Sequence, residues 1–181
     1  MTVSNRLLQI ALCLLLVTLT GCGFQLRGPK PMAFKTIYLQ MSQYSDLAAD
    51  IKRQIKTSGT TVAVEKPEDA EVQMIVVQDA REKAILALGP DGTVREYQLR
   101  QRFQFRLQDK QGKEVMSLQE INITRDITFN DSIVLAKEQE ELLLYRDMQN
   151  DLVQQVVRRL AAVRMNTATP PAVSGIPTAA P

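Results

Sequence analysis

Apolar and polar residues alternate most regularly over residues 97–107, and this pattern predicts a β-strand with one buried face. The apolar positions are odd-numbered, with Gln101 as the one exception. They are Tyr97, Leu99, Phe103, Phe105 and Leu107. The even positions are polar and include Arg100, Arg102 and Arg106. Because successive side chains of a strand point to opposite faces, we expect these arginines on the outer face.

Four further segments have the length and composition of strands. They cover residues 34–41, 60–65, 70–88 and 115–129. The first carries apolar side chains on both faces, which is typical of a central strand. Residues 79–83 are charged and predict a bend or bulge within the long third segment. Turn signals at residues 89–92 and 109–112 predict hairpins, so this part of the sheet is expected to be antiparallel.

Two segments follow helical periodicity instead. The first covers residues 45–58 and begins at an N-cap formed by Ser45 or Asp46. The second covers residues 133–163 and has capping side chains immediately before it, in residues 130–132. Its apolar residues recur mostly every three or four positions, so one stripe is expected to pack on the sheet. That stripe consists of Leu135, Leu142, Tyr145, Met148, Leu152, Val156, Leu160 and Val163.

Together these segments predict an α+β fold. Two helices pack on one face of a mixed, mostly antiparallel sheet of about four strands. The other face of the sheet is left for solvent or for a partner.

The N-terminal residues have the pattern of a bacterial lipoprotein signal. Arg6 supplies a positive charge, and residues 7–19 form an apolar run that is too short to span a bilayer. Leu-Thr-Gly-Cys at residues 19–22 then looks like a lipobox. On this interpretation residues 1–21 are removed, and Cys22 receives an N-acyl and an S-diacylglycerol group. The alternatives are an ordinary signal peptide with a chance cysteine, or a buried core helix.

This interpretation divides the chain into three parts. Residues 1–21 are the signal, residues 22–164 are a single periplasm-facing domain, and residues 165–181 are a disordered tail rich in Pro, Thr and Ala. Gly23 follows the lipidated cysteine, where Asp is the familiar inner-membrane retention signal. We therefore expect a lipid anchor in the outer membrane, on its periplasmic side.

Composition excludes several kinds of chemistry. The 22 Lys and Arg nearly balance 20 Asp and Glu, so the net charge of +2 gives no indication of a nucleic-acid partner. The absence of histidine excludes Ser-His and Cys-His catalysis and histidine metal sites. Cys13 lies in the signal and Cys22 is lipidated, so no free thiol remains. Glu138, Glu140 and Glu141 are candidates for a carboxylate-based peptidoglycan hydrolase, but a solvated helix face accounts for them better. We predict no enzyme, metal or cofactor.

Basic side chains offer two candidate binding features. Arg100, Arg102 and Arg106 form a row of guanidinium groups, which bind phosphate well. The same row suits a solvated sheet face on which the arginines pair with acids of the neighbouring strand. Lys137 lies near the start of the second helix, where a lone lysine is usually solvent-exposed.

The residues at 22–27, Cys-Gly-Phe-Gln-Leu-Arg, resemble the start of the mature chain in the LptE family of lipopolysaccharide-assembly lipoproteins. Three further features agree with this family. They are Gly92 followed by Glu-Tyr-Gln-Leu at 96–99, Leu-Ala-Lys at 135–137 before an acid-rich helix start, and the Pro/Thr/Ala tail. The resemblance covers essentially the whole mature chain and implies two helices against a four-stranded sheet.

The resemblance also implies a function. An outer-membrane lipoprotein of this family assembles with the LptD β-barrel, plugs it, and binds lipopolysaccharide for delivery to the cell surface. Basic residues in two places are tied to that binding: one is Lys137, and the other lies in a turn where this chain has Pro90. Arg95 or Arg81 is a candidate to replace the missing basic residue. Further candidates for lipopolysaccharide contacts are Arg95, Arg100 and Arg102. The alternative is a generic outer-membrane lipoprotein that scaffolds another envelope complex or binds another anionic ligand.

Overall fold

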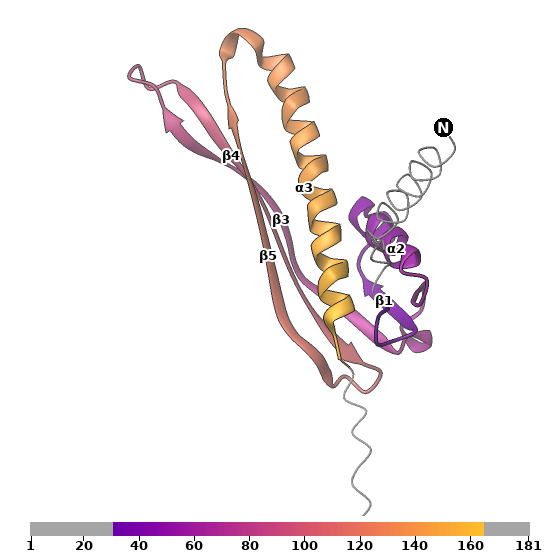
Figure 1. The fold of residues 1–181 in the computed structure, drawn as a ribbon. Coiled ribbons are helices and arrows are strands. Elements are labelled where there is room, and N and C mark those ends of the chain that lie inside the picture. Colours follow the sequence, from indigo (N-terminus) through magenta and orange to yellow (C-terminus); the bar gives the residue numbers. More distant parts are fainter. Residues whose placement is uncertain (1–30, 165–181) are drawn as a thin grey trace, which may run out of the picture.

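The computed structural model describes residues 31–164 (Figure 1). The lipobox, Cys22 and the tail at 165–181 lie outside the described residues. Within this range the predicted α+β fold is confirmed. Two α-helices lie on one face of a mixed sheet, which has five strands rather than about four.

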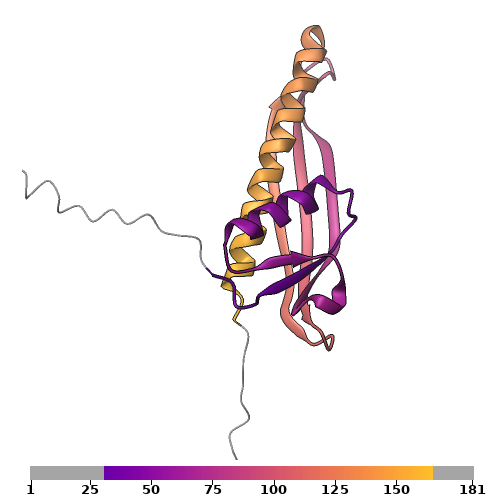
Figure 2. The same cartoon turned by 90° about the vertical axis from the view of Figure 1, so that its right-hand side faces the viewer.

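The sheet combines a short parallel part with a long antiparallel part. Its strands are β1 (Thr36–Gln40), β2 (Val62–Val64), β3 (Val72–Leu88), β4 (Val94–Asp109) and β5 (Glu114–Thr128), in the spatial order β2-β1-β3-β4-β5. As expected of a central strand, β1 has a neighbour on each side, and it runs parallel to both. The other pairs, β3 with β4 and β4 with β5, are antiparallel. These three strands extend well beyond β1 (Figure 2).

Both predicted hairpins are confirmed, and a glycine enables each turn. Gly92 lies between β3 and β4 and has a φ of +79°, whereas Gly112 lies between β4 and β5 and has a φ of +78°. Glycine adopts this left-handed region without the steric cost that a side chain brings. In the second turn the carboxylate of Asp109 accepts hydrogen bonds from the backbone amides of Gln111 and Lys113, both at 2.9 Å.

The bulge expected near the charged residues 79–83 is present, immediately outside them. Those residues pair regularly with β4, and the extra residues of β3 are Val77 and Leu86, on either side of them. An extra residue reverses the alternation of side chains between the two faces of a strand. Met74 faces the core before the first bulge, and Lys83 lies on that same face after it, opposite the buried Leu99. The charged segment of β3 therefore presents its odd-numbered residues to the helical side of the sheet.

The two helices begin differently. In α2 (Asp46–Thr57), the side chain of Ser45 caps the helix by accepting a hydrogen bond from the backbone amide of Ala48 at 3.3 Å. No side chain caps α3 (Val134–Ala162). The expected capping residue, Asn130, instead accepts a hydrogen bond from the amide of Ser132 and caps the one-turn 3₁₀ helix η2 (Asp131–Ile133). This short turn separates β5 from α3 and redirects the chain.

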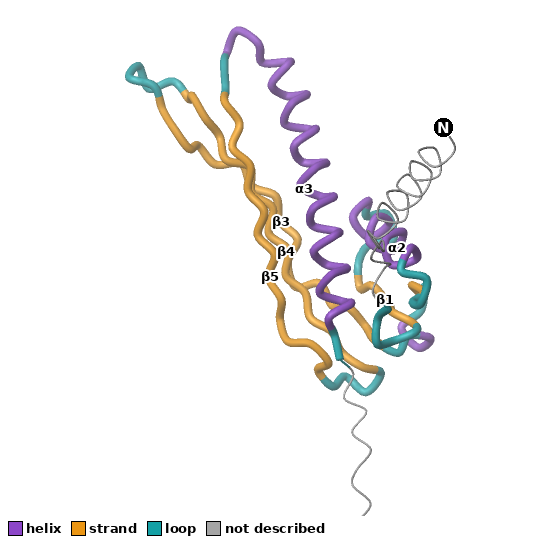
Figure 3. Tube along the Cα trace, in the orientation of Figure 1, coloured by secondary structure: helices purple, strands orange, loops and turns teal. Residues whose placement is uncertain are grey.

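The fully buried apolar side chains of α3 all lie in its C-terminal half. Its fully buried residues are Met148, Leu152, Val156 and Leu160, which join the core formed by the sheet and α2. The predicted stripe is wrong at its start, because Leu135 is 71% exposed and Leu142 is 54% exposed. The tip of the β3–β4 hairpin bends away from the start of α3, so this part of the helix has little sheet to cover (Figure 3). We call this part of the molecule, residues 83–97 and 127–143, the distal end.

Candidate anion-binding site

A cavity of about 200 Å³ lies at the distal end, between the first turns of α3 and the ends of the long strands. Its wall includes two lysines, one from the sheet and one from the helix, and two aromatic rings. These residues are Lys83 of β3, Tyr97 of β4, Phe129 after β5, and Lys137 of α3. The rings of Tyr97 and Phe129 meet edge to face, with their centroids 5.3 Å apart, and form an apolar wall. Two ammonium groups beside such a wall are suited to an anionic group attached to an apolar or sugar body.

Lys137 is held in place rather than free in solvent. Its Nζ donates hydrogen bonds to the hydroxyl of Thr128 at 2.9 Å and to the carboxylate of Glu140 at 2.8 Å. Its side chain is only 15% exposed. The structure thus places Lys137 in the wall of a cavity, whereas an isolated lysine at a helix start is usually solvent-exposed.

Lys83 is a basic residue of this site that the sequence did not single out. Its Nζ lies 2.6 Å from Oε2 of Glu141 on α3 and 4.3 Å from the centroid of the Tyr97 ring. An ammonium group over an aromatic face is attracted by the ring quadrupole, so the ring and the carboxylate together fix the Lys83 head group. The charged run at 79–83 could have indicated a basic residue here. The bulge at Val77, however, decides which face of the sheet each of these side chains occupies.

Further along α3 from the cavity, polar side chains join the helix to the strands β3 and β5. Arg81 donates a hydrogen bond to Gln149 at 2.5 Å and lies over the ring of Tyr145. Burial raises the pKa of the Tyr145 hydroxyl, and the nearby carboxylate of Glu141 raises it further. Arg125 of β5 likewise pairs with Asp151 of α3 at 2.5 Å. Arg81 is therefore engaged with the middle of the helix and does not line the distal cavity.

The arginine row of β4 faces away from the cavity. Arg102 pairs with Glu82 of β3 at 3.5 Å, and Arg100 donates a hydrogen bond to Gln98 at 2.7 Å. These even-numbered residues alternate with the buried residues Leu99, Gln101 and Phe103, so they lie on the outer face of the sheet. The structure does not bring them together with Lys137. The neighbouring-strand pairing expected of a solvated face is present for Arg102.

Arg95 lies at the distal end but is folded over the β3–β4 turn. A Cβ atom placed on Gly89 would come within 2.9 Å of Nε of Arg95, so the guanidinium group covers the turn. In that turn, hydrogen bonds from the hydroxyl and the amide of Thr93 lower the pKa of the Asp91 carboxyl, and the charge of Arg95 contributes a smaller effect. Arg95 is thus near an acid in the same turn as Pro90 and is not part of the cavity wall.

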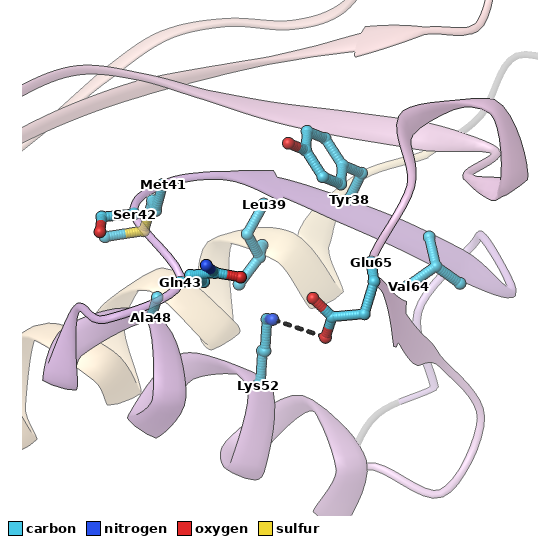
Figure 4. A pocket seen from close by; sticks show the side chains of 9 residues that line it. All are labelled: Tyr38, Leu39, Met41, Ser42, Gln43, Ala48, Lys52, Val64 and Glu65. Atoms are coloured by element: carbon cyan, nitrogen blue, oxygen red, sulfur yellow. Dashed lines mark hydrogen bonds and ion pairs between the residues drawn. The ribbon is translucent and has the colours of Figure 1, made fainter.

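A second cavity, of about 250 Å³, lies far from the distal end, between β1, β2 and α2 (Figure 4). Its one lysine, Lys52, pairs with Glu65 at 2.8 Å across the opening. The lining of this cavity thus offers an anion a single basic group, which is already paired. The distal cavity offers two basic groups from different elements, beside the carboxylates of Glu138 and Glu141.

Residues 31–164 give little support for a carboxylate-based catalytic site, a metal site or a membrane-spanning helix. Two of the three helix glutamates, Glu140 and Glu141, are ion-paired with lysines, an arrangement without a free carboxylate pair. No group of three or more Asp, Glu, Cys or His side chains in the described part of the chain is arranged to hold a metal ion. Neither helix of that part combines the length and the apolar composition that crossing a membrane requires.

The fold defines a class of small α+β domain, in which two helices cover one face of a five-stranded sheet and one end holds a cavity lined by two lysines. The sequence profile of the LptE family, described as lipopolysaccharide-assembly, matches residues 34–160. The chain therefore belongs to this family.

Individual relatives agree with this assignment. The chain is 28% identical over 163 residues to an LPS-assembly lipoprotein LptE of Yersinia enterocolitica. The aligned region covers 88% of this chain and 77% of the relative. Its fold is similar to an uncharacterized lipoprotein B of Nitrosomonas europaea, with 40% identity, a TM-score of 0.68, and coverage of 77% and 91% of the two chains. It is also similar to the rare lipoprotein B of Shewanella oneidensis, with 25% identity, a TM-score of 0.60, and coverage of 71% and 95%.

Proposed function

We propose that this protein is an outer-membrane lipoprotein that binds lipopolysaccharide through its distal cavity and assembles with the LptD β-barrel. Membership of the lipopolysaccharide-assembly family supports the general role. The observation that carries the ligand assignment is the position of Lys137, which lies in the wall of the cavity beside Lys83 and two aromatic rings. The phosphates of lipopolysaccharide accept charge-assisted hydrogen bonds from ammonium groups. This role is a binding role and requires no catalytic residue.

The ligand assignment is tested by replacing Lys137 with Asp. We expect weaker binding of lipopolysaccharide by the purified protein, because the change removes a donor and adds a charge that repels phosphate. Lys110→Asp makes the same change at an exposed position in the opposite β4–β5 turn and should leave binding unchanged. A direct titration of both variants with labelled lipopolysaccharide gives the answer. Equal affinity of Lys137→Asp and the unaltered protein would show that Lys137 is not a ligand residue.

Partnership with a β-barrel has independent support in the surface of the distal end. Large apolar side chains are exposed there on β3, on η2 and on α3. They are Ile85, Leu86, Leu88, Ile133, Val134, Leu135, Leu142 and Leu143. Clustered exposed apolar residues mark surfaces that contact a protein or a membrane. We infer that this surface contacts the barrel lumen when the domain plugs it.

Co-purification tests the partnership. With the lipidated protein as bait, Leu135→Asp should lower the yield of the β-barrel, since a charge would be buried without a partner. Gln154→Asp, at an exposed position in the other half of α3, is the matched control. Recovery of the lipidated protein without any large β-barrel would instead favour a generic scaffolding lipoprotein.

We propose the lipid anchor at Cys22 on the sequence pattern alone. The lipobox predicts that Cys22→Ala abolishes incorporation of labelled palmitate, because the thiol that receives the lipid is removed. Membrane fractionation of that variant should show loss from the outer membrane. Undiminished labelling would show that the lipid is attached elsewhere.

A further inference from the structure

We propose that Lys83 and Lys137 jointly hold one phosphate group, and that the carboxylate of Glu141 occupies the place of that phosphate until the ligand displaces it. This inference rests on the proposed function and specifies the site. It assigns a ligand role to Lys83 and a gating role to Glu141.

The two lysines come from different elements of the fold. Lys83 comes from β3, the central strand of the sheet, and Lys137 from α3, yet both line the same cavity of about 200 Å³. Each lysine is already paired, with Nζ of Lys83 2.6 Å from Glu141 and Nζ of Lys137 2.8 Å from Glu140. The two ammonium groups face three carboxylates, those of Glu138, Glu140 and Glu141, so the site has no excess of positive charge. An anion that binds both lysines must therefore displace at least one carboxylate.

Glu141 is the carboxylate placed for displacement. It lines the cavity itself and its side chain is 23% exposed, whereas Glu140 is 48% exposed and is not part of the cavity wall. A carboxylate and a phosphate offer lysine the same kind of acceptor, namely anionic oxygen atoms. The Glu141 oxygen thus marks a position that a phosphate oxygen can take beside Lys83.

Neighbouring groups other than the carboxylates also contact the two lysine head groups, so each can stay in place while a phosphate replaces its carboxylate partner. The ring of Tyr97 holds the Lys83 head group, and the hydroxyl of Thr128 holds that of Lys137, independently of either carboxylate. Both pairs are partly exposed, and such pairs contribute about fivefold or less to an equilibrium constant. A phosphate with up to two negative charges and three acceptor oxygens can compete with a contribution of that size.

The test compares variants of both partners in a titration with labelled lipopolysaccharide. Lys83→Met keeps an unbranched side chain over Tyr97 but removes the charge, and should weaken binding about fivefold to tenfold. Glu141→Gln removes the competing carboxylate and should tighten binding about threefold to fivefold. If the pair only supported the fold, both variants would lose the same contact and would change binding in the same direction. Opposite signs are the expected result, and equal signs would overturn the proposal.

Matched controls separate displacement from a general change in charge. Glu138 lines the same cavity but forms no ion pair with any residue in 31–164, so Glu138→Gln removes an equal charge without freeing a lysine. Glu141→Gln should tighten binding more than Glu138→Gln, and equal effects would remove the gating role. Lys110→Met, in the opposite turn, should bind as the unaltered protein does. Dephosphorylated lipopolysaccharide should bind all variants alike if phosphate is the group that is held.

Different results would refute the proposed function and the joint phosphate site. If the unaltered protein does not bind lipopolysaccharide, the proposed function is wrong. If it binds lipopolysaccharide but Lys137→Asp binds it equally well, Lys137 is not a ligand residue and the joint site is wrong with it. If Lys137→Asp weakens binding but Lys83→Met and Glu141→Gln bind as the unaltered protein does, only the joint site is wrong. Thermal unfolding of each variant verifies that the fold is retained.

Discussion

Gln101 is a buried amide whose replacement should stabilise the protein. It lies on the core face of β4, between Leu99 and Phe103, and is only 1% exposed. Neither its Nε2 nor its Oε1 atom has a hydrogen-bond partner among the described residues. The strand places it there because the period of two gives position 101 the same face as its apolar neighbours. A polar group buried without a partner loses its hydrogen bonds to water and gains none in return.

The magnitude follows from that loss. Leaving one buried polar group unsatisfied costs about 1–3 kcal/mol. Gln101→Met keeps the length of the side chain and removes both polar atoms, so little new cavity or overpacking arises. We therefore expect the free energy of unfolding to rise by about 1–3 kcal/mol. For a domain of this size, each kcal/mol raises Tm by about 4 °C.

Urea titration followed by circular dichroism measures this change. Gln104→Met is the matched control, because Gln104 lies on the outer face of the same strand and donates a hydrogen bond to Glu120 at 3.2 Å. A surface change of this kind should stay within about 0.5 kcal/mol. If Gln101→Met lowered the free energy of unfolding, the reasoning would be refuted, since the amide would then be hydrogen-bonded in the folded protein.

Three further predictions concern α3 and one turn. Leu152→Ala removes a fully buried side chain and should cost about 2–5 kcal/mol of unfolding free energy, whereas Leu135→Ala should cost less than about 0.5 kcal/mol; urea titration checks both. Gly112→Ala places a side chain at a φ of +78° and should cost about 1 kcal/mol or more in the same assay. Amides at 138–146 should exchange hydrogen faster than those at 148–160, and equal protection in a mass-spectrometric exchange experiment would contradict the unequal packing of α3.

Local patterns were sufficient to predict most of the fold. Strict alternation in β4 and two turns that end in glycine define the hairpins, and these signals act over a few residues. The apolar stripe of the second helix was also recognised, but its packing was not. Helical spacing gives Leu135 and Leu152 the same expectation, although only Leu152 meets the core. The length of helix that the sheet covers depends on how the strands assemble and bend. The spacing of residues along one helix cannot predict it.

The candidate site was predicted only in part, for a related reason. Lys137 was identified through resemblance, and the sequence did not indicate that Thr128 and Glu140 hold it in a cavity wall. Lys83 was missed because strict alternation from Met74 would place it on the outer face. The single extra residue at Val77 transfers it to the helical side. A one-residue irregularity thus decides whether a second cation reaches the site.

The division of α3 explains how one helix can serve both the core and the site. Residues 137, 141, 148 and 152 follow helical spacing, so they lie close to one face of a continuous helix. That face is apolar where the sheet covers it and charged where the hairpin bends away. The buried residues Met148 and Leu152 fix the rotation of the helix, and this rotation aims Lys137 and Glu141 at the sheet. The site is therefore positioned by the core, while its own contacts stay weak enough for a ligand to exchange them.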